Sequence, residues 1–168
     1  SRMCMIMAGK TNIIIIGVII VVVGVIGSAY VNVLGVSEET QAIDWADPGN
    51  KELVTRGAVI YDEVCGTCHG NNLQGQPDWR TKTEDGMLPA PPHDASGHTW
   101  HHPDQLLFEI TKFGGQKNAP EGFISAMPEF GDILNDEEIW ASLAYIKSRW
   151  PENIRKRHAQ MSERMKVN

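Results

Sequence analysis

The 168-residue sequence predicts an all-α fold, with one helical domain over residues 51–152 and a single N-terminal transmembrane helix over residues 13–35. Two observations support this prediction. Residues 11–37 contain no charged side chain and consist largely of Ile and Val. Three later segments repeat apolar residues at helical spacing, and the chain shows little strand-like alternation. Beyond the apolar stretch, the chain is long enough for one domain and too short for two.

The apolar stretch is long enough to cross a membrane, because about twenty apolar residues span the bilayer core as a helix. A cleaved signal peptide is the alternative, with Gly27-Ser28-Ala29 as a weak cleavage site. Signal peptides have shorter apolar regions, so we expect the helix to be retained as an uncleaved anchor. Arg2 and Lys10 precede it and acidic residues follow it. Residues 1–12 are therefore expected in the cytoplasm and the domain on the export side.

Charged segments flank the predicted domain on both sides. Residues 36–50 form an acidic linker with an Asp47-Pro48-Gly49 turn signal, which would tether the domain near the membrane. The formal net charge of the chain is −6, which argues against nucleic acid as a partner. Residues 153–168 form a basic C-terminal tail. We expect this tail to be a solvated end, with docking on acidic lipid or an acidic partner as the alternative.

The domain contains three predicted helices. The first covers residues 51–65, and the second starts at a proline and covers residues 103–114, where a Gly-Gly pair ends it. The third opens with Asn135 as its N-cap and Glu138 three positions later, a variant of the capping box. A proline at position 151 closes it.

The first helix leads into the sequence Cys65-Gly66-Thr67-Cys68-His69. A Cys-x-x-Cys-His run is the attachment site of a c-type haem, where both thiols bind the porphyrin and the histidine ligates its iron. A structural zinc site would need about four ligands, and the one other cysteine, Cys4, lies beyond the apolar stretch. A thiol redox motif would need a βαβ setting. The sequence therefore predicts one covalent haem c.

With this motif in place, residues 50–150 resemble the class I c-type cytochromes. Gly57 and Tyr61 stand eight and four residues before Cys65, like the glycine and aromatic of that family's first helix. In the family these two pack against the last helix, which here contains residues 143–145. The resemblance implies the class I cytochrome c fold around one haem.

The resemblance also implies further haem contacts. Ser125-Ala126-Met127-Pro128 is similar to the family's ligand loop and implies that Met127 is the sixth iron ligand. A core methionine is the alternative, and Met87 is a poorer ligand candidate. The family's proline carbonyl, which accepts the second ring hydrogen of the axial histidine, implies Pro91 as partner of His69, with Pro92 as second choice. The connection from His69 is longer here than in the family.

A second departure is a group of four histidines within ten residues: His93, His98, His101 and His102. Such a cluster could bind copper or zinc, or supply an alternative axial ligand. An ordinary polar loop is the favoured interpretation, and the metal site stays open as the alternative.

These features together favour a one-electron carrier in a respiratory or photosynthetic chain, located in a bacterial inner membrane with its haem domain in the periplasm. The resemblance implies a cytochrome bc complex as donor and a terminal oxidase or reaction centre as acceptor, with membrane lipid around the anchor. The alternatives are a fixed haem-bearing subunit of an oxidase, dehydrogenase or supercomplex, and a haem ligand sensor or metal-binding cytochrome. We do not expect enzymatic catalysis by the chain itself, because two axial ligands leave no site for a substrate on the iron.

Overall fold

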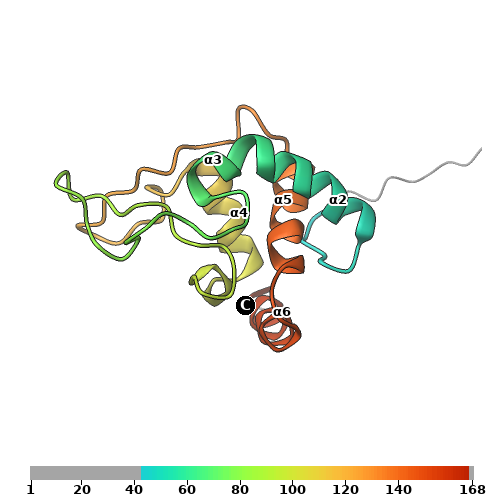
Figure 1. Cartoon of the computed structure of the whole chain (residues 1–168). Coiled ribbons are helices and arrows are strands. Elements are labelled where there is room, and N and C mark those ends of the chain that lie inside the picture. Colours follow the sequence, from blue (N-terminus) through green and yellow to red (C-terminus); the bar gives the residue numbers. More distant parts are fainter. Residues whose placement is uncertain (1–42, 167–168) are drawn as a thin grey trace, which may run out of the picture. The chain divides into compact units, whose positions relative to one another are not determined.

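In the computed structural model, which describes residues 43–166, the chain forms helices joined by loops and contains no strand in that range (Figure 1). The predicted all-α class is confirmed for these residues. The elements are α2 (Lys51–Ile60), the π-helical turn η1 (Tyr61–Cys65), α3 (Gly66–His69), the 3-10 turn η2 (Thr99–His101), α4 (Asp104–Phe113), α5 (Asp136–Ser148) and α6 (Glu152–Lys166).

The predicted membrane helix, residues 13–35, and the N-terminal segment 1–12 lie outside the described residues. Within residues 43–166, no helix combines the length and the apolar character needed to cross a bilayer.

Helix α2, η1 and α3 form one continuous helical run that ends at the haem motif. Asn50 caps its start, because its side-chain oxygen accepts a hydrogen bond from the backbone N–H of Leu53 at 3.0 Å. The prediction ended this helix at Cys65, whereas the run continues through a π-helical turn to His69. Gly70 ends it with a φ of 77°, a conformation that glycine adopts without strain. The π turn includes Cys65 and changes the helical register at the start of the haem motif.

Helix α5 crosses α2 at close range, and this crossing is the centre of the core (Figure 1). The predicted capping box is present, with Asn135 and Glu138 exchanging two hydrogen bonds of 3.0 Å. A Cβ atom at Gly57 would overlap the backbone carbonyl of Ala141, so the glycine permits this close approach. Tyr61, one turn later, is buried against Tyr145 with ring centroids 5.4 Å apart.

Helix α4 packs on α5 through the stacked rings of Phe108 and Trp140, whose centroids lie 4.3 Å apart. A buried ion pair joins the same two helices. Lys147 Nζ lies 2.7 Å from both carboxylate oxygens of Asp104, and both side chains are at most 7% exposed.

The C-terminal tail differs from the prediction of a solvated end, because residues 152–166 form helix α6. His158 and Ser162 on this helix are buried, and Ser162 Oγ accepts a hydrogen bond of 3.0 Å from the backbone N–H of Asp104. His158 Nε2 lies 2.8 Å from the carbonyl oxygen of His102. Helix α5 ends at Ser148, and Pro151 directly precedes α6. The buried residues of α6 stand at helical spacing and dock this helix on the domain.

Part of the predicted linker also belongs to the domain. Ala46 is fully buried, and Ile43 packs against the core. The predicted turn is present, since the Asp47 side chain accepts a hydrogen bond of 2.8 Å from Gly49 N. Ile43 and Ala46 therefore attach the end of the predicted linker to the domain, and residues 36–42 lie outside the described residues.

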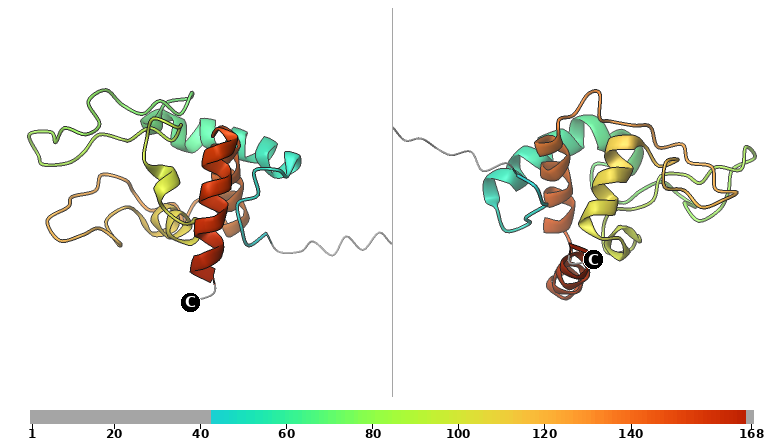
Figure 2. Two further views of the ribbon diagram at one scale, coloured as in Figure 1. Left: turned by 90° about the horizontal axis from the view of Figure 1, so that it is seen from below. Right: turned by 180° about the vertical axis from the view of Figure 1, so that it is seen from behind.

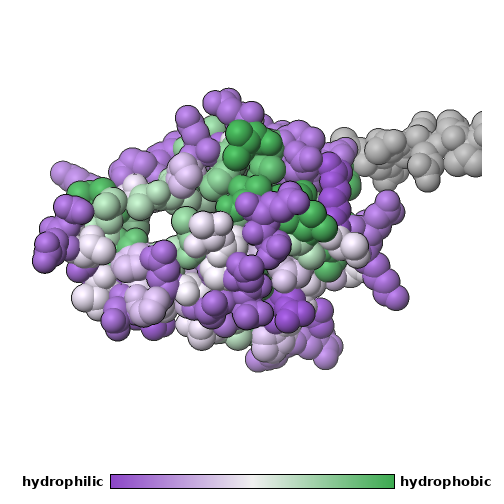
Figure 3. Space-filling view, turned by 45° about the horizontal axis from the view of Figure 1, so that its top comes forward, coloured by the Kyte–Doolittle hydropathy of each residue, from purple (hydrophilic) through white to green (hydrophobic). Residues whose placement is uncertain are grey.

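Two long loops, residues 70–98 and 114–135, extend from the same side of the helices (Figures 1 and 2). The space-filling view shows a hollow that passes between these loops and the helical part, bordered along its upper side by hydrophobic residues (Figure 3). Helix α3 lies along the upper side of the domain in Figure 1, and α6 lies on the lower side.

Candidate haem-binding site

The Cys-x-x-Cys-His motif closes the helical run at α3. Cys65 is partly buried, Cys68 is exposed, and both are free thiols. Burial, together with the neighbouring Cys68, raises the pKa of the Cys65 thiol to about 11. At neutral pH this thiol therefore stays protonated.

The imidazole of His69 is buried and held by a backbone carbonyl. Its Nδ1 lies 2.8 Å from the carbonyl oxygen of Pro91, the first-choice partner from the sequence. A carbonyl can only accept, so Nδ1 carries the hydrogen and Nε2 keeps its lone pair. Burial lowers the pKa of His69, although the bond to Pro91 acts in the opposite direction. The result is a neutral imidazole with Nε2 available as a metal ligand.

The long connection after His69 does not displace Pro91, because hydrogen bonds close it at its base. Gly75 N donates to the carbonyl of His69 at 2.7 Å, and Gln76 N donates to the carbonyl of Ala90 at 2.9 Å. Gly75 has a φ of 68°, and a Cβ there would meet the backbone of the Pro91-Pro92 segment. Residues 77–89 thus form the outer part of the loop, beyond a closed neck formed by the paired backbones of Gln76 and Ala90. The insertion therefore leaves His69 and Pro91 within hydrogen-bond distance of one another.

Tyr61 lies next to the motif and supports it. Its hydroxyl donates to the carbonyl oxygen of Gly70 at 3.2 Å, one residue after His69. Burial raises the pKa of this phenol, so it remains a neutral donor. Tyr61 thereby ties the π turn to the residue that ends α3.

Met127 lies in the loop that follows α4, and its backbone is tied back to the end of that helix. Its carbonyl oxygen accepts a bond of 3.1 Å from Gly115 N, and its own N–H donates to Ser125 Oγ at 3.2 Å. Gly114 has a φ of 82°, and a Cβ at Gly115 would collide with the Ser125 hydroxyl. The Gly-Gly pair therefore lets the ligand loop lie close to the helix end. Met87 lies in the outer part of the other loop, where its carbonyl accepts from Thr83 N at 2.8 Å.

The four clustered histidines do not converge on one point. His93 stacks on His69 at 3.9 Å between centroids, His98 stacks on Trp79 at 5.3 Å, and His101 stacks on Trp100 at 3.7 Å. The rings of His98 and His102 make an edge contact, with centroids 5.5 Å apart. Across residues 43–166, no three His, Cys, Asp or Glu side chains are arranged to hold a metal ion. Their aromatic stacking partners instead fix these rings in the loop.

Several features of the domain fit a bound haem. The neutral His69 offers one nitrogen, two reduced thiols precede it, and a hollow opens between the loops (Figure 3). Trp100 Nε1 is buried and has no hydrogen-bond partner among the described residues. An indole N–H can only donate, so it suits an outside acceptor such as a haem propionate carboxylate. From the sequence, Trp100 had no role of its own, although a tryptophan among polar loop residues was an available signal.

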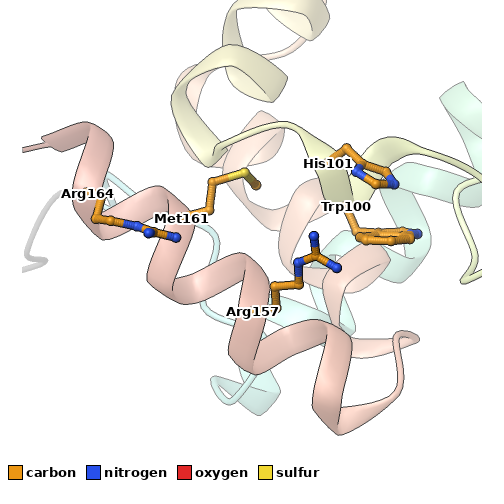
Figure 4. Close-up of a pocket in the computed structure, with 5 residues that line it drawn as sticks. All are labelled: Trp100, His101, Arg157, Met161 and Arg164. Atoms are coloured by element: carbon orange, nitrogen blue, oxygen red, sulfur yellow. The ribbon is translucent and has the colours of Figure 1, made fainter.

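A separate cavity of about 150 Å³ lies between η2 and α6 and contains none of the haem motif. Arginine and methionine side chains from α6 face an aromatic pair across it, and Arg157 lies 5.7 Å from the centre of the Trp100 ring (Figure 4). Its lining is Trp100, His101, Arg157, Met161 and Arg164. This cavity belongs to the docking of α6.

Comparison with curated proteins finds distant relatives of the same domain. The chain is 29% identical over 97 residues to the cbb3-type cytochrome c oxidase subunit FixP of Rhizobium meliloti (strain 1021) and 28% identical over 97 residues to that of Sinorhizobium medicae (strain WSM419). Each match covers 56% of this chain and 29% of the relative, so the chain aligns with less than a third of those proteins. No solved structure matches the chain.

The family comparison covers more than half of the sequence. The cytochrome c family model matches residues 54–150, a range that includes most of α2, the haem motif, both long loops and α5. The geometry around His69, the paired thiols and this match lead to one conclusion: the chain belongs to the cytochrome c family.

Proposed function

We propose that the protein transfers single electrons through one haem c, attached at Cys65 and Cys68 and ligated by His69 and Met127. The observation that carries this proposal is the buried His69 imidazole, whose Nδ1 is held by Pro91 and whose Nε2 is left to bind metal. When bound, the haem supplies a one-electron iron couple. If His69 and Met127 both bind the iron, no position on it would remain for a substrate, and electron transfer would be the expected chemistry.

Each contacting residue has a distinct part in this proposal. Pro91 fixes the orientation of the axial imidazole and increases its basicity as a ligand. Tyr61 and the α2–α5 crossing shield the inner face of this helical run, because Tyr61 and Gly57 are buried. The exposed Cys68 supports a surface-accessible attachment edge, from which an electron can reach a docked partner.

We further propose that residues 13–35 anchor the protein in a bacterial inner membrane, with the domain in the periplasm. A cytochrome bc complex is the proposed donor, and a terminal oxidase or photosynthetic reaction centre is the proposed acceptor. The acidic surface of the domain, in a chain of formal charge −6, supports docking on a partner with a basic face.

A second candidate function is that of a fixed subunit. The curated relatives are named as subunits of a cbb3-type oxidase, which favours an oxidase complex as the assembly. Purification of the untagged protein from its native membrane in mild detergent separates the two functions. A carrier should elute alone, whereas a subunit should co-purify with other chains in a constant ratio.

Substitution of Met127 tests the proposed ligation. Met127→Ala should open the sixth position, produce a high-spin fraction in the optical spectrum and allow carbon monoxide to bind the reduced protein. Met127→His should lower the midpoint potential by on the order of 0.1 V, because a thioether favours the reduced iron more than a second imidazole does.

Met87→Ala is the matched control, since Met87 lies in the other loop and should leave the spectrum unchanged. The oxidised wild type should show the weak far-red sulfur-to-iron band. If Met127→Ala kept that band and the wild-type potential, Met127 would not be the ligand.

A further inference from the structure

The imidazole of His93 packs face to face on that of His69. The two ring centroids lie 3.9 Å apart, and the planes are inclined by 26°. The His69 ring is also held at its edge, by the bond from Nδ1 to the carbonyl of Pro91. That bond fixes one ring atom but leaves the plane free to rotate about the bond direction. A flat neighbour against the ring face opposes this rotation.

His93 can act as such a neighbour because its backbone is fixed from two sides. Its N–H donates to the carbonyl of Leu73 at 2.8 Å, and its carbonyl accepts from Trp150 Nε1 at 2.7 Å. Leu73 and Trp150 are only 1% and 2% exposed, so both partners belong to the core. The Cα of His93 is therefore anchored between the start of one loop and the end of α5.

The side chain of His93 is held as well. Its Nδ1 lies 2.8 Å from the hydroxyl oxygen of Thr99, a residue that is 6% exposed. The edge of Tyr61 meets the His93 ring at 74°, with centroids 6.1 Å apart. The ring is thus restrained by a hydrogen bond and an aromatic contact in addition to its stack on His69.

We propose that His93 is a positioning residue of the haem site, which fixes the plane of the His69 imidazole. This inference rests on the proposed function insofar as His69 must ligate the iron. The orientation of an axial imidazole determines how its π orbitals overlap the iron orbitals, and groups around a ligand tune the metal in this way. Removing the flat neighbour should change the electronic asymmetry of the site without removing a ligand.

Electron paramagnetic resonance of the oxidised, haem-loaded protein tests the proposal, together with the nuclear magnetic resonance shifts of the four haem methyl groups. His93→Ala should shift the g values and change the spread of the methyl resonances. His93→Phe keeps a flat ring against His69 and should restore values close to those of the wild type. His98→Ala is the control, because His98 stacks on Trp79 and should leave both spectra unchanged.

Thr99→Val gives a second route if His93→Ala fails to fold or to bind haem. It removes the hydrogen bond to His93 Nδ1 while leaving the His93 ring in the chain, and it should shift the same signals by a smaller amount. A wild type that lacks a low-spin haem spectrum would contradict the proposed function. A low-spin wild type whose spectra are unchanged by both His93→Ala and Thr99→Val would overturn the positioning role alone. If His93→Ala cannot be loaded with haem, unchanged spectra in Thr99→Val alone would overturn it.

Discussion

At the residue scale, a few backbone contacts prepare the chemistry of the site. Pro91 contributes only its carbonyl oxygen, and this is sufficient to select the tautomer of His69. Gly75 permits the close passage of chain that brings this carbonyl into place. Gly57 has a similar part, because its lack of a side chain lets α2 and α5 approach closely. A side chain at either glycine would collide with backbone, which has little freedom to move away.

Gly57→Ala should destabilise the domain, because its methyl group would overlap the Ala141 carbonyl at the α2–α5 crossing. Inserting a methyl group into a packed contact costs about 1–3 kcal/mol, and a backbone neighbour favours the upper end. The midpoint of urea unfolding, followed by circular dichroism, measures the loss. Gly49→Ala is the control, because its Cβ meets only the exposed Asp47 side chain. Equal stability of the two variants would contradict the close crossing.

At the element scale, helices α4, α5 and α6 meet at one buried polar group of residues. Asp104 at the start of α4 accepts from Lys147 of α5, and its backbone donates to Ser162 of α6. His158 of α6 lies 3.9 Å from the same carboxylate. The Lys147 contact joins α5 to α4 across 43 positions of the sequence, and the Ser162 contact joins α6 to α4 across 58.

Lys147→Met should destabilise the protein by about 3–5 kcal/mol, because it leaves the carboxylate of Asp104 buried without its ammonium partner. Replacing both residues, Asp104→Leu with Lys147→Met, should recover most of the loss, since a buried ion pair is often replaceable by apolar packing. Urea unfolding of the three proteins provides the comparison. A single variant as stable as the wild type would show that the buried pair contributes little.

The stability of the α6 contact should depend on pH through His158. Burial lowers the pKa of His158, with Lys147 acting in the same direction and with Asp104 and the His102 carbonyl opposing it. Because Nε2 donates to His102, protonation would place a hydrogen on Nδ1, which is buried and has no partner among the described residues. The unfolded chain, with a histidine pKa of about 6.5, then binds the proton more readily than the folded chain.

The contribution of His158 is therefore fully present above pH 6.5 or so and decreases as the pH falls below that value towards the lowered folded pKa. His158→Gln keeps a donor for His102 and cannot titrate, so its unfolding free energy should fall less steeply than that of the wild type between about pH 7 and pH 5. Urea titrations at several pH values measure both slopes. Parallel slopes would exclude His158 as the source. The other histidines are common to both proteins and cancel in the comparison.

The elements differ in how far local sequence could predict them. The capping box at Asn135 and the Gly-Gly end of α4 are local signals, and both are present as predicted. The π turn at Tyr61 has no signature in the spacing of apolar residues. The spacing of Ile154, His158 and Met161 is helical and could have indicated α6. The run of basic residues instead favoured a solvated tail. Its docking rests on Asp104, which no local pattern connects to it.

At the scale of the whole molecule, the haem motif and the family resemblance could be predicted from the sequence, whereas the shape of the loops could not. The closed neck at Gln76 and Ala90 shows how a long insertion leaves the His69–Pro91 contact intact. The stack of His93 on His69 also arises from this closure, because His93 N bonds to the carbonyl of Leu73 across the neck. Long-range backbone pairing of this kind has no signature in residue spacing.

The protein isolated from its native membrane should retain residues 13–35 and carry one haem. The apolar stretch exceeds the length of a cleaved signal region, and the two thiols would each form one covalent bond to the porphyrin. Intact-mass measurement of the membrane fraction reports both properties at once, since the haem adds its mass to the chain that is present. Replacing Cys65 and Cys68 by Ser together should remove the added haem mass while leaving the N-terminus unchanged. A wild-type mass that corresponds to a chain starting near Tyr30 would contradict the anchor, and a mass without haem would contradict attachment at Cys65 and Cys68.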